Sequence, residues 1–256
     1  MCAIHSEKNE SFNVIMNFDS KAHSYESAAS IQHDLVKWGT EWMEDTLNGR
    51  TVLEMGAGTG TLTRHLVQRT PARLIATDAA PRMLTLGQKA CPTADWQLMD
   101  AWQPRLSGFD RIYSSSLLQW APEPEAILRR WRVCLNPGGQ LLALLFVEET
   151  LPELQQLVPH LRTIVWHSRT KWETYLVKAG FRILRAEAQM QNYAFPSAVT
   201  LFKSLHHIGA TQPWQLGSRA LRQILRLYEE RFTTGDAVHS TWTFYRVECL
   251  CEEIAG

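Results

Sequence analysis

Apolar runs and amphipathic stretches alternate along the chain between residue 49 and about residue 147. Short apolar runs are typical of buried strands, and the stretches between them have the spacing of surface helices. The predicted strands of this region cover residues 51–55, 72–78, 95–99, 110–115 and 140–146. The predicted helices cover residues 62–69, 81–89 and 123–135. This alternation predicts an α/β fold with a doubly wound, mostly parallel sheet.

The C-terminal part of the chain predicts two further strands, which makes seven in all. Residues 151–157 and 170–179 have helical patterns, and Gly180 is suited to end the second of these helices. A strand pattern follows over residues 181–190, and the last one covers residues 241–251 with alternating apolar residues. The chain therefore ends in strands that complete the sheet.

A long segment, residues 195–239, separates these last two strands and contains helical patterns at 197–208 and 218–232. Insertions of this length are usually lids or partner surfaces. The residues before Gly49 also lie outside the sheet and have helical patterns, most clearly over residues 28–47. We therefore expect an N-terminal helical cap (1–48) and a main domain (49–256) with a helical insertion (195–239).

The composition describes a globular chain with an ample core. Hydrophobic residues make up 45% of the 256 residues, and charged residues make up 20%. Lysine plus arginine equals aspartate plus glutamate at 26 each, so the charge favours neither nucleic acid nor a membrane surface. The longest apolar run, residues 141–147, is much shorter than a membrane span, and no signal peptide is visible. Five scattered cysteines are typical of a reduced cytoplasm.

The first predicted strand runs directly into the sequence EMGAGTG, in which Gly56, Gly58 and Gly60 occupy alternate positions. A dinucleotide-binding turn needs a glycine where Thr61 stands, and a P-loop needs lysine and then serine or threonine at Thr61 and Leu62. Three alternate glycines have a cost in backbone entropy that an ordinary turn does not require. The turn therefore predicts a ligand that approaches bare backbone and has no polyphosphate. A glycine-rich turn without a ligand is the competing interpretation.

Two acidic residues flank this turn at the ends of the first two strands. Glu54 would repel a phosphate group and attract a positively charged amino group. Asp78 ends the second strand, where a carboxylate can accept hydrogen bonds from both hydroxyls of a ribose. A ligand with an ammonium group, a ribose and no phosphate is S-adenosylmethionine. The alternative for Asp78 alone is a helix N-cap before Pro81.

The ends of the third and fourth strands bring further residues to the same edge of the sheet. Asp100 can accept a hydrogen bond from an adenine amino group, with the Trp102 ring beside it. Met83, one turn into the helix after the second strand, can cover an adenine face. Ser115 at the end of the fourth strand suggests contacts to the methionine portion. The alternatives are a solvated turn aspartate, a core methionine and a serine-rich helix cap.

Four longer motifs resemble the malonyl-acyl-carrier-protein O-methyltransferases of biotin synthesis, a family of class I methyltransferases. These motifs are FDSKAHSYESAASIQ from Phe18, the glycine motif, FDRIYSSSLLQW from Phe109 and LNPGGQLLALLFVEETLPEL from Leu135. The segments FKSLHHIGA and TWTFYRVE are similar to the insertion and the last strand of that family. The glycine motif identifies only the superfamily, whereas QW, LPEL and LHHIGA narrow the resemblance, which covers about residues 18–248.

The resemblance implies a Rossmann-like fold and methyl transfer from S-adenosylmethionine to the free carboxylate of a malonyl thioester on acyl carrier protein. The methyl ester formed would prime pimeloyl synthesis for biotin. By position, Tyr25 and Gln32 would close over the cofactor, and Gln119 and Trp120 would line the substrate side. The alternative for Tyr25 is a packed aromatic residue. The expected cofactor residues are Gln32, Glu54, Gly56, Ala57, Gly58, Asp78, Ala79, Met83, Asp100, Ala101, Trp102 and Ser115.

Two residues depart from the pattern of that family. Glu54 stands where the family often has aspartate, and Ser115 stands where it commonly has asparagine. The reaction itself needs little acid–base apparatus, because a sulfonium methyl is already an electrophile and a carboxylate is already an anion at neutral pH. No certain catalytic residue and no metal site is therefore expected. A cation beside the substrate carboxylate is expected instead, with Arg111, Arg162 and Arg169 as candidates.

Acyl carrier proteins are acidic, so this neutral chain needs a local basic patch to attract one. Arg219, Arg222 and Arg226 fall on one face of a predicted helix, and Lys203 could extend the patch. The alternative is a solvated stripe with no role. Two other functions stay open, a class I methyltransferase for another small acid or a quinone precursor, and a non-enzymatic scaffold. A nucleic-acid methyltransferase is disfavoured, because no Asn-Pro-Pro-aromatic motif follows the fourth strand.

Overall fold

The structure, a computed structural model, describes residues 15–26, 28–158, 166–208 and 217–252. Its sheet has the order β3-β2-β1-β4-β5-β8-β6, and a two-residue strand, β7, pairs with β8 outside this path. All pairs up to β5 are parallel, and β8 runs antiparallel to both β5 and β6. The predicted α/β fold with a mostly parallel sheet is confirmed. Its strands are β1 (Thr51–Met55), β2 (Arg73–Asp78), β3 (Asp95–Leu98), β4 (Phe109–Ser115), β5 (Leu135–Phe146), β6 (Phe181–Phe195), β7 (Thr233–Thr234) and β8 (Ala237–Cys251).

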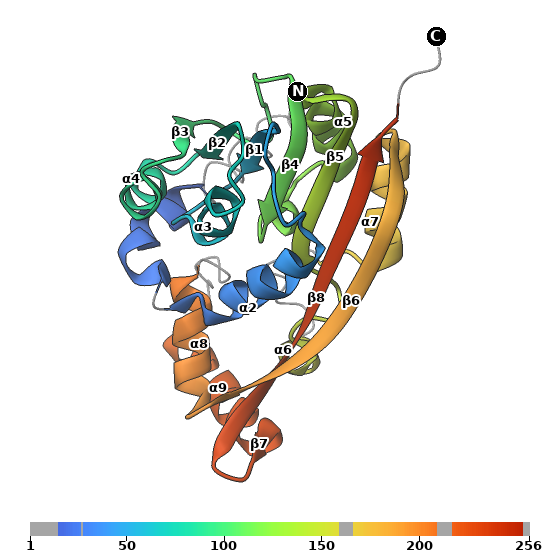
Figure 1. The fold of residues 1–256 in the computed structure, drawn as a ribbon. Coiled ribbons are helices and arrows are strands. Elements are labelled where there is room, and N and C mark those ends of the chain that lie inside the picture. The colour runs from blue at the N-terminus through green and yellow to red at the C-terminus, as the bar shows by residue number, and fades with distance from the viewer. Residues whose placement is uncertain (1–14, 27, 159–165, 209–216, 253–256) are drawn as a thin grey trace, which may run out of the picture.

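Helices cover both faces of this sheet. Residues 15–26 form the N-terminal helix, which precedes the labelled elements in Figure 1. The short 3-10 helices are η1 (Thr40–Trp42) and η2 (Leu118–Trp120). The α-helices are α2 (Ser30–Gly39), α3 (Thr61–Val67), α4 (Pro81–Ala90), α5 (Pro124–Cys134), α6 (Pro152–Leu157), α7 (Arg169–Lys178), α8 (Ala198–His207) and α9 (Ser218–Phe232). No helix in these described ranges is long and apolar enough to cross a membrane.

Alternate residues of β5 face two different cores, as the two-residue period of a strand requires. Leu142 and Leu144 belong to a cluster with α2, α8 and the buried face of α9. Leu141 and Leu145 belong to a second cluster with α5 and α7. Both faces are covered, which explains why β5 is an almost continuous apolar run. Figure 1 shows α2, α8 and α9 together on one side of the sheet.

The N-terminal segment differs from its prediction, since helix ends at Trp42 instead of continuing to residue 47. Met43 has extended backbone. The rings of Trp38 and Trp42 lie 4.1 and 4.3 Å from the guanidinium of Arg246, which is 5% exposed. This stacked contact with β8 fixes where the helix stops, and it joins residues too far apart in sequence for a local pattern to reveal it.

The insertion also differs at its edges. β6 continues to Phe195 and β8 begins at Ala237, so the two strands pair over almost their whole length. Strand therefore occupies part of the segment predicted as insertion, and α8 and α9 fill much of the rest. The Tyr228 hydroxyl of α9 donates to the carbonyl of His239 at 3.1 Å. The Ser204 hydroxyl of α8 donates to the carbonyl of Ala28 at 3.3 Å. These contacts connect the insertion to the sheet and to the N-terminal segment.

Candidate cofactor and substrate site

The glycine turn connects β1 to α3 and needs glycine at each of its three positions. Gly56, Gly58 and Gly60 have φ of +69°, +57° and +90°, a region that side chains with a β-carbon rarely adopt. A β-carbon on Gly56 would lie 2.7 Å from the side chain of Leu117. One on Gly58 would meet nothing within 4 Å. Gly58 therefore borders open space, which is what a ligand approaching the backbone requires.

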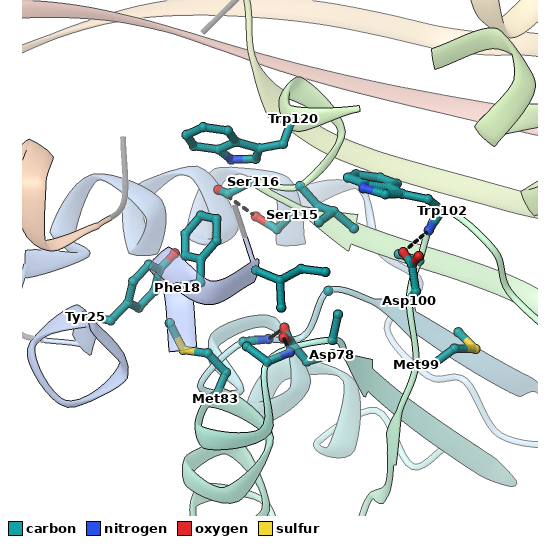
Figure 2. A pocket seen from close by; sticks show the side chains of 17 residues that line it. Phe18, Tyr25, Asp78, Met83, Met99, Asp100, Trp102, Ser115, Ser116 and Trp120 are labelled. Carbon is teal, nitrogen blue, oxygen red and sulfur yellow. Dashed lines mark hydrogen bonds between the residues drawn. The ribbon is translucent and has the colours of Figure 1, made fainter. Parts of the chain in front are cut away.

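A cavity of about 720 Å³ lies at the carboxyl ends of the first four strands, beneath the N-terminal helix. Figure 2 shows Phe18, Tyr25 and Trp120 on one side of it and Asp100 and Trp102 on another. Eleven residues predicted for the site line it together: Tyr25, Gly56, Gly58, Asp78, Ala79, Met83, Asp100, Ala101, Trp102, Ser115 and Trp120.

Six lining residues were missed by the sequence analysis, namely Ile15, Phe18, Ala80, Met99, Ser116 and Leu117. Four of them are sequence neighbours of predicted residues, and closeness to a strand end was the available signal. Ile15 and Phe18 come from the N-terminal helix. Phe18 is the first residue of the motif FDSKAHSYESAASIQ, but no function was predicted for it. The Phe18 ring packs edge-on against Tyr25 and Trp120, with centroids 6.2 and 5.6 Å away.

Asp78 both lines the cavity and stabilises the turn beside it. One carboxylate oxygen accepts the backbone N–H of Gly58 at 2.8 Å, and the other accepts the N–H of Ala80 at 2.8 Å. Burial raises the pKa of Asp78, while these backbone hydrogen bonds act in the opposite direction. Each carboxylate oxygen has a second acceptor position. Asp78 can therefore hold the turn and still accept hydrogen bonds from a bound ligand.

Asp100 has the same double placement after β3. Its carboxylate accepts the N–H of Trp102 at 2.8 Å, as Figure 2 shows, and it lines the cavity. The indole N–H of Trp131, a fully buried residue of α5, donates to the carbonyl of Ala101 at 2.7 Å. The loop after β3 is thus fixed from both sides before any ligand arrives. The hydrogen bond from Trp102 agrees with the alternative that Asp100 is a turn aspartate. The same carboxylate can still accept a hydrogen bond from a ligand.

Glu54 and Ala57 are placed differently from their prediction, because neither lines the cavity. Glu54 is 2% exposed and accepts a hydrogen bond from the Thr63 hydroxyl of α3 at 2.7 Å. Burial raises the pKa of Glu54 to about 8, so the side chain is largely uncharged at neutral pH. The backbone N–H of Ala57 donates to the carbonyl of Thr77 at 2.8 Å. The geometry therefore makes Glu54 a support for α3 instead of a partner for a ligand ammonium group.

A second, smaller chamber of about 280 Å³ adjoins the cofactor cavity. The two share Phe18, Tyr25, Ser116 and Trp120 as a common wall. Gln119 lines this chamber, as expected for the substrate side. Gln32 also lies here and is not among the residues of the cofactor cavity, which corrects its predicted place. The remaining described lining is Phe146, Trp166, Ile208 and Trp242.

Of the predicted cations, neither Arg111 nor Arg169 is among the described residues that line this chamber. Arg111 is buried, forms an ion pair with Glu44 and donates to the carbonyl of Asp110. Arg169 is exposed and lies 3.7 Å from a carboxylate oxygen of Glu149. Arg162 lies outside the described residues. Burial raises the pKa of the Tyr25 phenol, which keeps this shared wall uncharged at physiological pH.

Polar contacts on several sides hold the N-terminal helix over the cofactor cavity. The carboxylate of Asp19 accepts the backbone N–H of Arg82 at the start of α4 at 2.7 Å. The ammonium group of Lys21 donates to the carbonyl of His206 in α8 at 2.6 Å. The Thr59 hydroxyl, inside the glycine turn, donates to the carboxylate of Glu26 at 2.6 Å. The helix thus connects the glycine turn, the second helix of the sheet domain and the insertion.

Comparison with known proteins identifies the class to which this site belongs. A family model described as a methyltransferase domain matches residues 52–139. An S-adenosylmethionine-dependent methyltransferase from Mesorhizobium loti superposes with a TM-score of 0.54 at 16% identity, over 84% of this chain and 97% of that one. A protein of Bacillus halodurans C-125 superposes with a TM-score of 0.64 at 12% identity, over 88% and 100%. The chain contains a methyltransferase domain by the match to the family model, and its fold is that of the class I methyltransferases.

The predicted resemblance to malonyl-acyl-carrier-protein O-methyltransferases is also confirmed. The protein of that name from Xylella fastidiosa (strain M23) is 29% identical, over 80% of this chain and 74% of its own. The one from Halalkalibacterium halodurans is 26% identical, over 91% and 96%. A trans-aconitate 2-methyltransferase from Variovorax paradoxus is 36% identical over only 35% of this chain. The first two of these relatives, which cover most of the chain, are thus both malonyl-acyl-carrier-protein O-methyltransferases.

Proposed function

We propose that the protein transfers the methyl group of S-adenosylmethionine to the free carboxylate of a malonyl thioester carried by acyl carrier protein. The product would be the malonyl methyl ester that primes pimeloyl synthesis for biotin. The observation that carries the proposal is a second chamber beside the cofactor cavity, with no charged residue among its described lining, in a chain similar to malonyl-acyl-carrier-protein O-methyltransferases. A cytoplasmic location is part of the proposal.

The residues of the larger cavity fit S-adenosylmethionine. Gly58 leaves the backbone open on the cavity side, and Asp78 and Asp100 present carboxylates with free acceptor positions. When bound, the cofactor supplies an electrophilic sulfonium methyl, which a carboxylate oxygen takes as the carbon–sulfur electron pair passes to sulfur. Met83 and Trp102 offer apolar surface to a flat base, and Ser115 lines the cavity at the end of β4.

The side chains around the shared wall can align the reactants without moving a proton. Phe18, Tyr25 and Trp120 line both cavities, and their packed rings give an apolar surface where the two adjoin. Holding two reactants in line is worth roughly 7–11 kcal/mol, so positioning alone is a large part of the catalysis required. Because the Tyr25 phenol is kept protonated, it acts as a wall and not as a base.

Product analysis tests this proposal. The protein is incubated with methyl-labelled S-adenosylmethionine and with malonyl, succinyl or acetyl acyl carrier protein, and each product is examined by mass spectrometry. We expect one added methyl group, as an ester, on the malonyl substrate and none on the acetyl substrate, which has no free carboxylate. Methyl transfer to nitrogen or carbon, or equal labelling of the acetyl control, would contradict the proposal.

A second candidate is methylation of a small free tricarboxylic or dicarboxylic acid. It is favoured by the similarity of part of this chain to a trans-aconitate 2-methyltransferase. Free trans-aconitate therefore belongs in the same assay. A higher kcat/KM for trans-aconitate than for the malonyl carrier would support this candidate over the first.

The docking face for the carrier is proposed on α9 and α8. Arg219, Arg222, Arg226 and Lys203 are all exposed. The apolar residues of α9 face the interior, so the arginines are directed outward. The guanidinium of Arg226 donates to Glu230 at 2.6 Å, which offsets part of its charge and leaves Arg219 and Arg222 as the main contributors. An acidic carrier would be attracted to these groups at low ionic strength.

A further inference from the structure

The smaller chamber has two polar groups that are satisfied by nothing in the described protein. Gln32 comes from α2 and Gln119 from η2, and each is 8% exposed. The amide oxygen of each has no hydrogen-bond partner. No hydrogen bond within the described ranges involves either amide nitrogen. A buried polar group without a partner costs ~1–3 kcal/mol, so two in one small chamber indicate a ligand that completes their hydrogen bonds.

The remaining lining narrows what that ligand can be. Of the described residues around the chamber, none is charged, and most are aromatic. The chamber is smaller than the cofactor cavity and shares the wall of Phe18, Tyr25 and Trp120 with it. A substrate group held in this chamber would therefore lie beside the cofactor cavity.

We infer that the amides of Gln32 and Gln119 recognise the substrate carboxylate in this chamber, as neutral donors in the place predicted for Arg111 or Arg169. The inference rests on the proposed function and gives its site a specificity determinant. Each amide has two N–H donors, and rotation about its last side-chain torsion exchanges the NH₂ group with the oxygen. A carboxylate accepts hydrogen bonds only and is costly to bury without them.

Neutral donors suit a carboxylate that must act as a nucleophile. A guanidinium fixed on the oxygen would hold its lone pairs in a strong ion pair and would also repel a sulfonium nearby. Amide donors orient the carboxylate and leave the sulfonium as its nearest opposite charge. The absence of Arg111 and Arg169 from the described lining is explained on the same basis.

The test compares methionine and glutamate at each position. Gln→Met keeps the length of the side chain and removes the donors, whereas Gln→Glu adds a negative charge. For Gln119 or Gln32→Met we expect kcat/KM for malonyl-pantetheine to fall by ~10- to 100-fold, mainly through KM, because hydrogen bonds to charged groups are worth ~1.5–3 kcal/mol. For the glutamate variants we expect a deeper fall. Gln189→Met and Gln189→Glu, at an exposed site on β6, are the matched controls.

Two further readouts separate this inference from a folding defect and from the proposed function. The affinity for S-adenosylmethionine should stay within about twofold in all variants, since neither amide lines the cofactor cavity. Calorimetry of malonyl-pantetheine with the S-adenosylhomocysteine complex measures binding without turnover. Suppose that the parent binds malonyl-pantetheine without methylating it and that the variants bind it more weakly. This result would support the amide site and reject the proposed function.

Parent-like kcat/KM in all four variants would overturn the inference while leaving the proposed function intact. A glutamate variant that binds malonyl-pantetheine more tightly than its methionine counterpart, and still does so as pH is raised, would overturn it too, because an ionised carboxylate at that position repels another. Absence of any binding of malonyl-pantetheine to the parent complex would have the same consequence.

Discussion

Glu54 should make the stability of this protein depend on pH in a way that a glutamine cannot. The carboxyl group is 2% exposed, and burial raises its pKa to about 8 from a usual value of 4.5. Between these values the unfolded chain has lost this proton and the folded chain has kept it. The free energy of unfolding therefore falls as pH rises from 4.5 to 8, and the loss is complete above that range.

The magnitude follows from the two pKa values. They differ by about 3.5, and each unit corresponds to ~1.36 kcal/mol, which gives a ceiling of about 5 kcal/mol. About 3 kcal/mol of this falls between pH 5.5 and pH 8.5. Glu54→Gln removes the titration and keeps a polar partner for Thr63. The unfolding free energy of the variant minus that of the parent should therefore be about 3 kcal/mol larger at pH 8.5 than at pH 5.5.

Urea unfolding of parent and variant, followed by circular dichroism at pH 5.5 and pH 8.5, measures this difference. Groups that do not interact with Glu54 titrate equally in both proteins and cancel. A stability difference that is the same at both pH values would refute the reasoning. Calorimetry with S-adenosylmethionine adds a functional readout, since we expect Glu54→Gln to bind it like the parent. A tenfold loss of affinity would instead restore Glu54 as a partner of the ligand ammonium group.

Two more outcomes are expected from the site and the proposed docking face. Tyr25→Phe should retain the rate of methyl transfer within about tenfold, and that rate should not change with pH above pH 6. The reason is that the raised pKa of Tyr25 excludes this residue as a base. A rate that depends on pH above pH 6 in the variant would contradict this. Replacing the α9 arginines with glutamate should raise the KM for carrier-bound substrate at low salt, with little change in kcat. The same replacement at three exposed arginines elsewhere should leave this KM unchanged. Equal KM values in the two triple variants would place the docking face elsewhere. The α9 set is Arg219, Arg222 and Arg226, and the control set is Arg73, Arg105 and Arg129.

Most of the sheet could be predicted from the sequence because its strands are local apolar runs and its turns have local signals. The glycines of the first turn require positive φ whatever surrounds them, so their pattern alone identified the cofactor edge. Asp78 and Asp100 were found because a parallel sheet brings strand ends to one edge. These residues are set by backbone geometry, which the sequence encodes over short distances.

The rest depends on contacts between distant segments. The partner of Glu54 is on α3, and only the docking of that helix decides that the carboxylate faces Thr63 and not the cavity. The helix that ends at Trp42 does so against Arg246, on the last strand. Gln32 and Gln119 meet in one chamber because the N-terminal segment folds over the fourth strand. No periodicity in either segment indicates that meeting.

The most direct test of the account is whether S-adenosylmethionine requires open backbone at Gly58. Gly58 and Gly235 both have positive φ, +57° and +62°, and a β-carbon on either meets nothing within 4 Å. Valine is therefore similarly strained at both positions, but only Gly58 lines the cavity. By calorimetry with S-adenosylmethionine, the account predicts that Gly58→Val loses binding while Gly235→Val binds like the parent. Parent-like affinity in a folded Gly58→Val variant would contradict it.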